Sequence, residues 1–239
     1  IFECHQPIWE IGTVQHTFFE LLRRSPSFQK LVVISKALKD VYLNKKSMGA
    51  TQVLVAHDAA DDPGNVEDKA VLTKGRRDAL QVGYVGNLYP GKGMSVITDV
   101  APHMPDLDFH VVGGSEDDIA KWKKRVKTEN VIFHGFVDQS EVSNYMEALD
   151  VCLLPNQQTV AVYGSGNADI GSYTSPLKMF EYMSHGKPIV ASDLPVLREI
   201  LRDGENALLC DPEDPSAWVK VLSQLDGDKD LRHDLGDQA

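Results

Sequence analysis

The sequence predicts an α/β fold with one doubly wound parallel sheet and a partial second α/β domain. Two observations predict it. First, six short apolar segments alternate with helical segments from Gln81 onward. Second, most of the helical segments are ten or more residues long. Connections of that length make neighbouring strands parallel, and right-handed crossovers place helices on both faces of the sheet. Such Rossmann-like domains bind ligands at the carboxyl ends of their strands.

The chain before Gln81 contains fewer strands. IFECH at the start has the pattern of a strand end, and buried-type strands are expected at 31–34 and 52–56. Apolar residues at helical spacing predict helices over 14–24 and 36–48, the second capped by Ser35. The polar cluster DDPGN at 61–65 predicts a turn, and the charged stretch after it predicts a linker.

The second part of the chain alternates regularly. Strands are expected at 82–86, 107–112, 130–134, 149–154, 188–191 and 207–210. Helices are expected at about 93–103, 115–127, 139–148, 175–185, 195–202 and 215–225. The loop between them at 155–173 is long, polar and rich in glycine, which is typical of functional loops.

The composition excludes several classes of protein. The net charge of −11 argues against a nucleic-acid partner. Cys4, Cys152 and Cys210 lack the spacing of a zinc site or a disulfide framework, which fits a reducing compartment. No apolar run is long enough to cross a membrane and no secretion leader opens the chain, so a cytoplasmic location is expected. Residues 1–50 hold seven Lys/Arg against four Asp/Glu, which leaves a peripheral position at the inner membrane face open, although a solvated helix face explains this charge more simply.

The main candidate site lies in TSPLKMFEYMSHGKPIVASD, residues 174–193. Ser175-Pro176 combines a hydroxyl cap with proline at the first helical position. Lys178 and Glu181 are three residues apart, so both side chains project from one side of the helix. Free amides, the Thr174 and Ser175 hydroxyls and a lysine suit a phosphate group. A carboxylate one turn further along can accept hydrogen bonds from the vicinal hydroxyls of a sugar.

Two interpretations of these residues stay open at this point. Ser-Pro caps begin many helices that bind nothing, and Lys178 with Glu181 can be a surface ion pair worth at most about 1 kcal/mol. However, the string SPLKMFEYMSHGKPIVASDLPVLREIL resembles the donor-binding segment of glycosyltransferase family 4, whose enzymes have the two-domain GT-B fold. The resemblance implies that Glu181 holds the ribose or sugar hydroxyls of a nucleotide sugar. It also implies that the helix start faces the diphosphate, with Tyr173, Thr174, Ser175, Pro176 and Leu177 in the donor site.

A glycine-rich loop, Gly86-Asn87-Leu88-Tyr89-Pro90-Gly91-Lys92-Gly93, follows the strand expected at 82–86. It matches the GxxxxGK loop of NTPases, but Gly93 stands where that loop needs Ser or Thr, and Pro90 supplies no amide. The loop resembles the GxLxxxKG pattern of family 4 more closely, which implies that Lys92 neutralises the diphosphate beside Gly86, Asn87 and Gly91. Asn87 replaces the usual arginine of the family, which implies one positive charge fewer. A plain turn with a solvated lysine is the alternative.

Three further positions enter by resemblance. Gly135, Phe136 and Val137 match a segment whose backbone meets the nucleobase, although a simple strand-to-helix turn has the same appearance. Tyr173 stands where many family members have a second glutamate, so the donor sugar stays undetermined. His5 matches a histidine that faces the donor sugar from the N-terminal domain, and an incidental histidine is the alternative.

The resemblance implies a retaining, metal-independent glycosyltransferase of polysaccharide biosynthesis with no cofactor, whose substrate is a UDP- or GDP-linked sugar. Its candidate catalytic residues are Glu181, Lys92, Lys178 and His5. It divides the chain into a partial acceptor-side region (1–65), a linker (66–80) and a donor-binding domain (81–239). The expected partners are a glycan or lipid-linked acceptor and a second copy that completes the cleft. The alternatives are a truncated module that binds or assembles nucleotide sugars without catalysis and, more weakly, a GT-B epimerase or phosphorylase.

Overall fold

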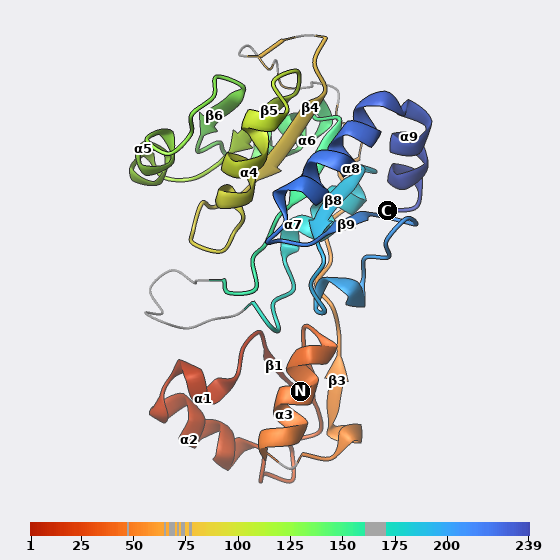
Figure 1. Cartoon of the computed structure of the whole chain (residues 1–239). Coiled ribbons are helices and arrows are strands. Elements are labelled where there is room, and N and C mark those ends of the chain that lie inside the picture. The colour runs from red at the N-terminus through yellow and green to blue at the C-terminus, as the bar shows by residue number, and fades with distance from the viewer. Residues whose placement is uncertain are drawn as a thin grey trace.

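Two parallel sheets organise the fold (Figure 1). The computed structural model describes residues 1–46, 48–64, 66, 70, 72, 75–76, 78–160 and 171–239. The linker expected at 66–80 and the loop expected at 155–173 therefore lie partly outside the described residues. We call the three-stranded sheet near the N-terminus with its helices the small unit, and the six-stranded sheet with its helices the large unit.

The large unit has the strand order β6-β5-β4-β7-β8-β9, with all neighbours parallel. The chain starts at the centre, extends to one edge, and then crosses back to build the other half. This order places a topological switch point between β4 and β7, where doubly wound sheets bind ligands. All six predicted strands are confirmed to within two residues: β4 (Gln81–Val85), β5 (Asp108–Val112), β6 (Val131–Gly135), β7 (Val151–Leu154), β8 (Ile189–Ser192) and β9 (Leu208–Cys210).

Helices cover both faces of this sheet because its strands are apolar on both sides. Val82 and Tyr84 of β4 belong to the core on one face, and Val85 belongs to the core on the other. The first core is closed by α4 (Met94–Val100) with the turn η2 (Ala101–His103), α5 (Glu116–Lys123), α8 (Pro215–Gly227) and α9 (Lys229–Asp237). The second core is closed by α6 (Gln139–Ala148) and α7 (Leu177–Ser184).

One predicted helix is wrong in type. The segment 195–202 forms only a 3-10 turn, η3 (Leu197–Glu199). Val196 is buried although it lies off the helical stripe that Leu194, Leu197 and Leu201 share, so the segment is covered on more than one side. Conversely, α9 is a regular helix that the sequence patterns did not predict. Asp228 caps this helix by accepting a hydrogen bond from the Leu231 amide at 2.9 Å.

The small unit is a parallel sheet in the order β1-β2-β3. Its core gathers around Phe19, Leu38 and Tyr42, none of which is exposed to solvent. The helix α1 and the 3-10 turn η1 were not predicted, and the other elements lie close to their predicted places. The elements are β1 (Phe2–Cys4), α1 (Ile8–Ile11), α2 (Thr13–Leu22), β2 (Leu31–Val33), α3 (Lys36–Lys46), η1 (Ala50–Gln52) and β3 (Val53–Val55).

Polar contacts join the two units. The Glu199 carboxylate of the large unit accepts hydrogen bonds from the backbone amides of Lys36 (2.6 Å) and Ala37 (2.8 Å), the first two residues of α3. It therefore adds, from across the junction, to the predicted cap of Ser35, whose hydroxyl accepts a hydrogen bond from the Leu38 amide (3.0 Å). In addition, the Ser35 hydroxyl donates to the Tyr173 carbonyl (2.8 Å), and the Tyr173 hydroxyl donates to Glu10 (3.0 Å).

Replacing Glu199 with alanine is expected to lower the free energy of unfolding by about 0.5–2 kcal/mol, because two amides of α3 lose their acceptor. Thermal unfolding followed by circular dichroism measures the change. Glu205→Ala is the matched control, since Glu205 pairs with Arg202 on the surface and its side chain is 64% exposed. If the two variants melt together, the contact across the junction does not contribute to stability.

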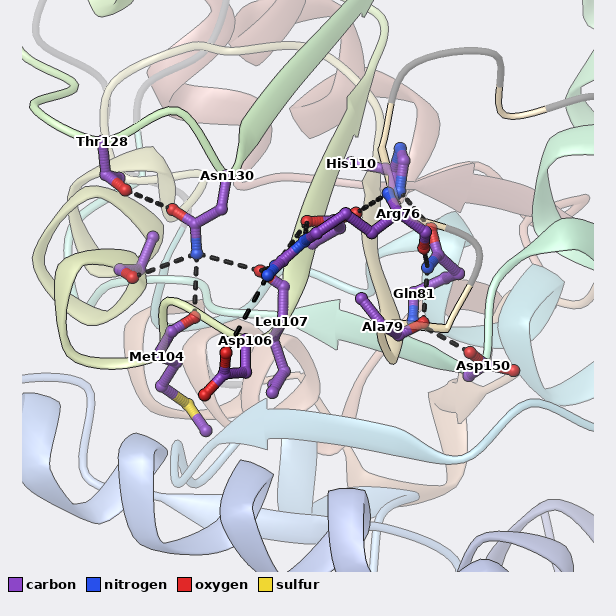
Figure 2. Close-up of polar contacts among 12 residues, drawn as sticks. Arg76, Ala79, Gln81, Met104, Asp106, Leu107, His110, Thr128, Asn130 and Asp150 are labelled. Carbon is purple, nitrogen blue, oxygen red and sulfur yellow. Dashed lines mark hydrogen bonds and ion pairs between the residues drawn. The ribbon is translucent and has the colours of Figure 1, made fainter.

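A polar network closes the amino ends of β5 and β6 (Figure 2). Arg76 pairs with the Asp108 carboxylate (2.9 Å) and also donates to the Leu107 carbonyl (3.2 Å). The Asn130 side-chain amide donates to the carbonyls of Ala101 (3.2 Å), Met104 (2.8 Å) and Leu107 (2.9 Å). These bonds hold the chain entering β4 and the turn before β5 against the sheet, at the end opposite to the strands' carboxyl ends.

Candidate functional site

A cavity of about 530 Å³ opens at the carboxyl ends of β4 and β5, beside the first turns of α6 and α7. It brings together segments that are far apart in the sequence but were predicted to meet. Its lining includes most of the predicted site residues: Gly86, Asn87, Lys92, Phe136, Val137, Thr174, Ser175, Pro176, Leu177, Lys178 and Glu181.

The floor of the cavity is made of backbone. Gly86 and Gly113 follow β4 and β5, with φ of 144° and 107°. A Cβ atom on Gly113 would lie 2.5 Å from the Gly86 carbonyl oxygen, so a side chain there has no room. A Cβ atom on Gly86 would lie 3.1 Å from the Lys178 Nζ. The two glycines therefore let the strand ends and the lysine approach one another closely.

Two lysines supply the positive charge of the cavity. Lys92 comes from the loop after β4 and Lys178 from the first turn of α7. Burial lowers the pKa of Lys92. Burial lowers the pKa of Lys178 well below its usual value; the nearby Lys92 lowers it further and Glu181 opposes the shift. Within the described residues, neither ammonium forms an ion pair. Because buried charges are normally paired, two unpaired lysines at one cavity suit an anionic ligand.

The start of α7 offers further donors. Pro176 has the extended backbone of a helix cap (φ −72°, ψ 115°), so α7 begins at Leu177, one residue later than the sequence predicted. Ser175 was predicted to cap the helix, but no side chain caps it in the described part of the chain. The Ser175 Oγ is instead buried at the cavity, with no hydrogen-bond partner among the described residues. A buried free hydroxyl next to uncapped amides suits a phosphate oxygen.

Glu181 lies one turn after Lys178 on the cavity side of α7. Its carboxylate has no hydrogen bond or ion pair within the described residues. A neighbouring side of the helix is fixed, because Met179 and Tyr182 are buried and the Tyr182 hydroxyl accepts a hydrogen bond from the Val85 amide (2.9 Å). The carboxylate is therefore held at the cavity and is available to a ligand.

Four predicted site residues do not line the cavity. Gly91 lies in the adjoining loop, where its carbonyl accepts from the Gln157 amide (2.8 Å). Gly135 ends β6, and its carbonyl accepts from the Gly113 amide (2.7 Å). Tyr173 is buried in the core of the small unit. His5 follows β1 and bonds to Glu3 (2.9 Å), with its side chain 61% exposed. Their roles toward a donor remain predictions.

The cavity also contains residues that the sequence did not single out. Tyr89 of the loop after β4, and Gln139 and Val142 of α6, complete its wall. Helix α6 was predicted, so its first turn is expected near the carboxyl ends of the strands, but no motif marks these side chains. Tyr84 does not line the cavity, but its hydroxyl and ring contact Lys178.

No group of three or more His, Cys, Asp or Glu side chains could hold a metal ion in the described ranges. Likewise, none of the helices in those ranges has the length and apolarity needed to span a bilayer. A larger cavity, about 940 Å³, lies beside Arg76, Asp108 and Asn130 at the amino ends of β5 and β6. The polar groups there bond to one another, as Figure 2 shows, whereas no hydrogen bond or ion pair joins Lys92, Lys178 and Glu181 of the smaller cavity in the part of the chain that the structure describes.

Comparisons with known proteins identify the family of this chain. The model of the family described as glycosyl transferases group 1 matches residues 79–228. The phosphatidyl-myo-inositol mannosyltransferase of Mycobacterium leprae is 30% identical over 171 residues, 70% of this chain and 38% of that protein. The D-inositol 3-phosphate glycosyltransferase of Corynebacterium urealyticum is 27% identical over 67% of this chain and 38% of its own length. This chain therefore spans well under half the length of both relatives.

Solved structures share the fold. HepE of Anabaena, crystallised with UDP and glucose, has a TM-score of 0.72 at 17% identity, covering 99% of this chain and 64% of that protein. Sucrose-phosphate synthase of Thermosynechococcus elongatus also has a TM-score of 0.72, at 19% identity, covering 99% of this chain and 60% of its own. At 17% and 19% identity, these similarities show a shared fold only.

Proposed function

This chain belongs to the glycosyl transferases group 1 family, and we propose that it binds a nucleotide diphosphate sugar in the cavity at the carboxyl ends of β4 and β5. The observation that carries the proposal is the pair of lysines, Lys92 and Lys178, without ion-pair partners in the described residues. The free Ser175 hydroxyl adds a third donor beside them. A diphosphate is the group in such a substrate that matches this set of charges.

In this proposal the donor lies along α7. The diphosphate meets Lys92, Lys178 and the amides at the start of the helix, and Glu181 accepts hydrogen bonds from the ribose or sugar hydroxyls. The base lies toward Phe136 and Val137, where the exposed Phe136 ring (81%) offers an apolar surface. UDP and GDP sugars are the favoured donors, and UDP is found with HepE.

The proposed reaction transfers the sugar with retention at its anomeric carbon. The bond between this carbon and the β-phosphate oxygen breaks, and the leaving nucleoside diphosphate keeps the electron pair. The acceptor hydroxyl oxygen bonds to the same face of the carbon, and its proton passes to the leaving phosphate. Lys92 and Lys178 stabilise the charge that develops on the diphosphate, which is the main electrostatic contribution these residues can make. His5 is proposed to approach the donor sugar from the small unit.

The affinity for UDP or GDP is expected to fall as the pH rises. The pKa of Lys178 is lowered in the free protein, and a bound diphosphate raises it, so binding takes up a proton between these two pKa values. Calorimetry above about pH 7.5, where a terminal phosphate with a pKa of about 6 is already ionised, separates the lysines from the phosphate; because burial also lowers the pKa of Lys92, the comparison of wild type with Lys178→Met gives the share of Lys178. An affinity that rises with pH in this range would contradict the role of Lys178.

A second candidate function is a module that binds the nucleotide sugar without transferring it. The match covers 38% of the length of the mannosyltransferase relative, so binding and transfer by this chain are tested separately. A transfer and donor-hydrolysis assay separates the two: binding with turnover supports the transferase, and binding without turnover supports the module. A second copy that completes the cleft is part of the transferase proposal, and light scattering after gel filtration measures it.

A further inference from the structure

Tyr84 of β4 reaches the site from inside the protein. Its ring is fully buried in the core between the sheet and α4. Its hydroxyl lies 2.7 Å from the Lys178 Nζ and 2.6 Å from the backbone carbonyl oxygen of Asn87. The same ammonium lies 3.9 Å from the centre of the Tyr84 ring. Tyr84 therefore contacts the lysine with both its hydroxyl and its ring face.

The direction of these hydrogen bonds is fixed. A carbonyl oxygen only accepts, so the single proton of the Tyr84 hydroxyl is donated to Asn87. The oxygen lone pairs then face Lys178, whose ammonium donates to them. Burial raises the pKa of Tyr84, so the hydroxyl keeps its proton and this arrangement persists across the working pH range.

This contact restricts a side chain that is flexible by nature. Lysine carries its charge on a four-carbon stem with three donors, and its rotamers must be limited before it binds a ligand in one place. The Tyr84 hydroxyl oxygen accepts a hydrogen bond from one of the three N–H groups of the ammonium, and the other two N–H groups are left for the cavity. Tyr84 holds the ammonium beside the Gly86 backbone, where a Cβ atom would lie only 3.1 Å from the Nζ. The Asn87 side chain carries no charge, so Lys178 and Lys92 supply the positive charge among the described residues that line the cavity.

We infer that Tyr84 is a positioning residue for diphosphate recognition: its hydroxyl and ring fix the Lys178 ammonium beside Gly86, where it meets the diphosphate together with Lys92. The inference rests on the proposed function of the cavity and adds a residue that itself does not line it. The accepted hydrogen bond and the ring face also favour the charged form of the lysine. The charged or titratable groups that face Lys178 are Tyr84, Lys92 and Glu181.

A double-mutant cycle tests this inference. Calorimetry with UDP and GDP compares the wild type with Tyr84→Phe, Lys178→Met and the double variant. Tyr84→Phe is expected to weaken binding about three- to tenfold, the effect of one hydrogen bond. In the Lys178→Met background, the same change is expected to alter the affinity less than about twofold, because Tyr84 acts through Lys178. The loss of affinity with rising pH is expected to begin at a lower pH in Tyr84→Phe than in the wild type.

Tyr42→Phe is the matched control, because it removes a buried hydroxyl that contacts Ile8 and Gln6 in the small unit. It is expected to lower the melting temperature about as much as Tyr84→Phe without changing nucleotide affinity. Equal losses from Tyr84→Phe in both backgrounds, or an unchanged affinity and pH profile, would overturn the role of Tyr84. If Lys178→Met itself has no effect, the proposed function of the cavity fails as well; if only Tyr84→Phe has none, the cavity assignment stands.

Discussion

Lys178→Met is expected to weaken the binding of UDP or GDP roughly 10- to 100-fold. The lysine is held between Tyr84 and Gly86 and has no anionic partner among the described residues, so its contact with a diphosphate is a full charge-assisted hydrogen bond. Such bonds contribute about 1.5–3 kcal/mol, and about 1.4 kcal/mol corresponds to a tenfold change in affinity. Methionine keeps the length and apolar character of the stem, so the variant is expected to fold.

The control for this variant is Lys121→Met, which removes one charge from an exposed position on α5. Calorimetry on both variants separates a local contact from the general effect of net charge, because a surface charge acts weakly across solvent. The phosphate-free nucleoside uridine should bind wild type and Lys178→Met equally. Equal weakening of UDP binding by both lysine variants would contradict the assignment of Lys178.

Gly113→Ala is expected to destabilise the protein by about 2–5 kcal/mol and to abolish nucleotide binding. The backbone conformation at φ 107° costs a side chain about 1–3 kcal/mol. In addition, the Cβ atom would lie 2.5 Å from the Gly86 carbonyl oxygen, and overpacking of this kind costs about 1–3 kcal/mol. The clash is with backbone, so relief requires a shift of Gly86 and with it the floor of the cavity.

Gly204→Ala separates these two costs. Gly204 also has positive φ (74°), but a Cβ atom there meets nothing within 4 Å. This variant is expected to lose about 1–2 kcal/mol from backbone strain and to bind UDP normally. Thermal unfolding and calorimetry check both variants. If Gly113→Ala melts and binds like Gly204→Ala, the close approach of the strand ends is not what shapes the cavity.

The sequence allowed the sheet and most of the cavity to be predicted because both follow from local patterns. Apolar segments at regular spacing define the six strands, and parallel strands bring their carboxyl ends to one edge of the sheet. Lys92 and Lys178, 86 positions apart in the sequence, were therefore expected in one site, and both line the cavity.

Other features depend on contacts that no local pattern records. Alternation along β4 predicts that Tyr84 is buried, but not that its hydroxyl meets a lysine from α7. The Glu199 carboxylate caps α3, whose first residues lie about 160 positions earlier in the chain. Tyr173 occupies a position that resemblance assigned to the donor site, yet its side chain is buried in the small unit, in the same core as Phe19 and Tyr42.

The central claim is that Lys92, Lys178 and the start of α7 form a binding site for the diphosphate of a nucleotide. A crystal structure with UDP or GDP, whichever raises the melting temperature more, tests it most directly. We predict diphosphate oxygens within hydrogen-bonding distance of both lysine Nζ atoms and of the Ser175 hydroxyl, with the ribose or sugar hydroxyls on Glu181. A diphosphate bound elsewhere on the molecule, with both lysines unchanged, would contradict this account.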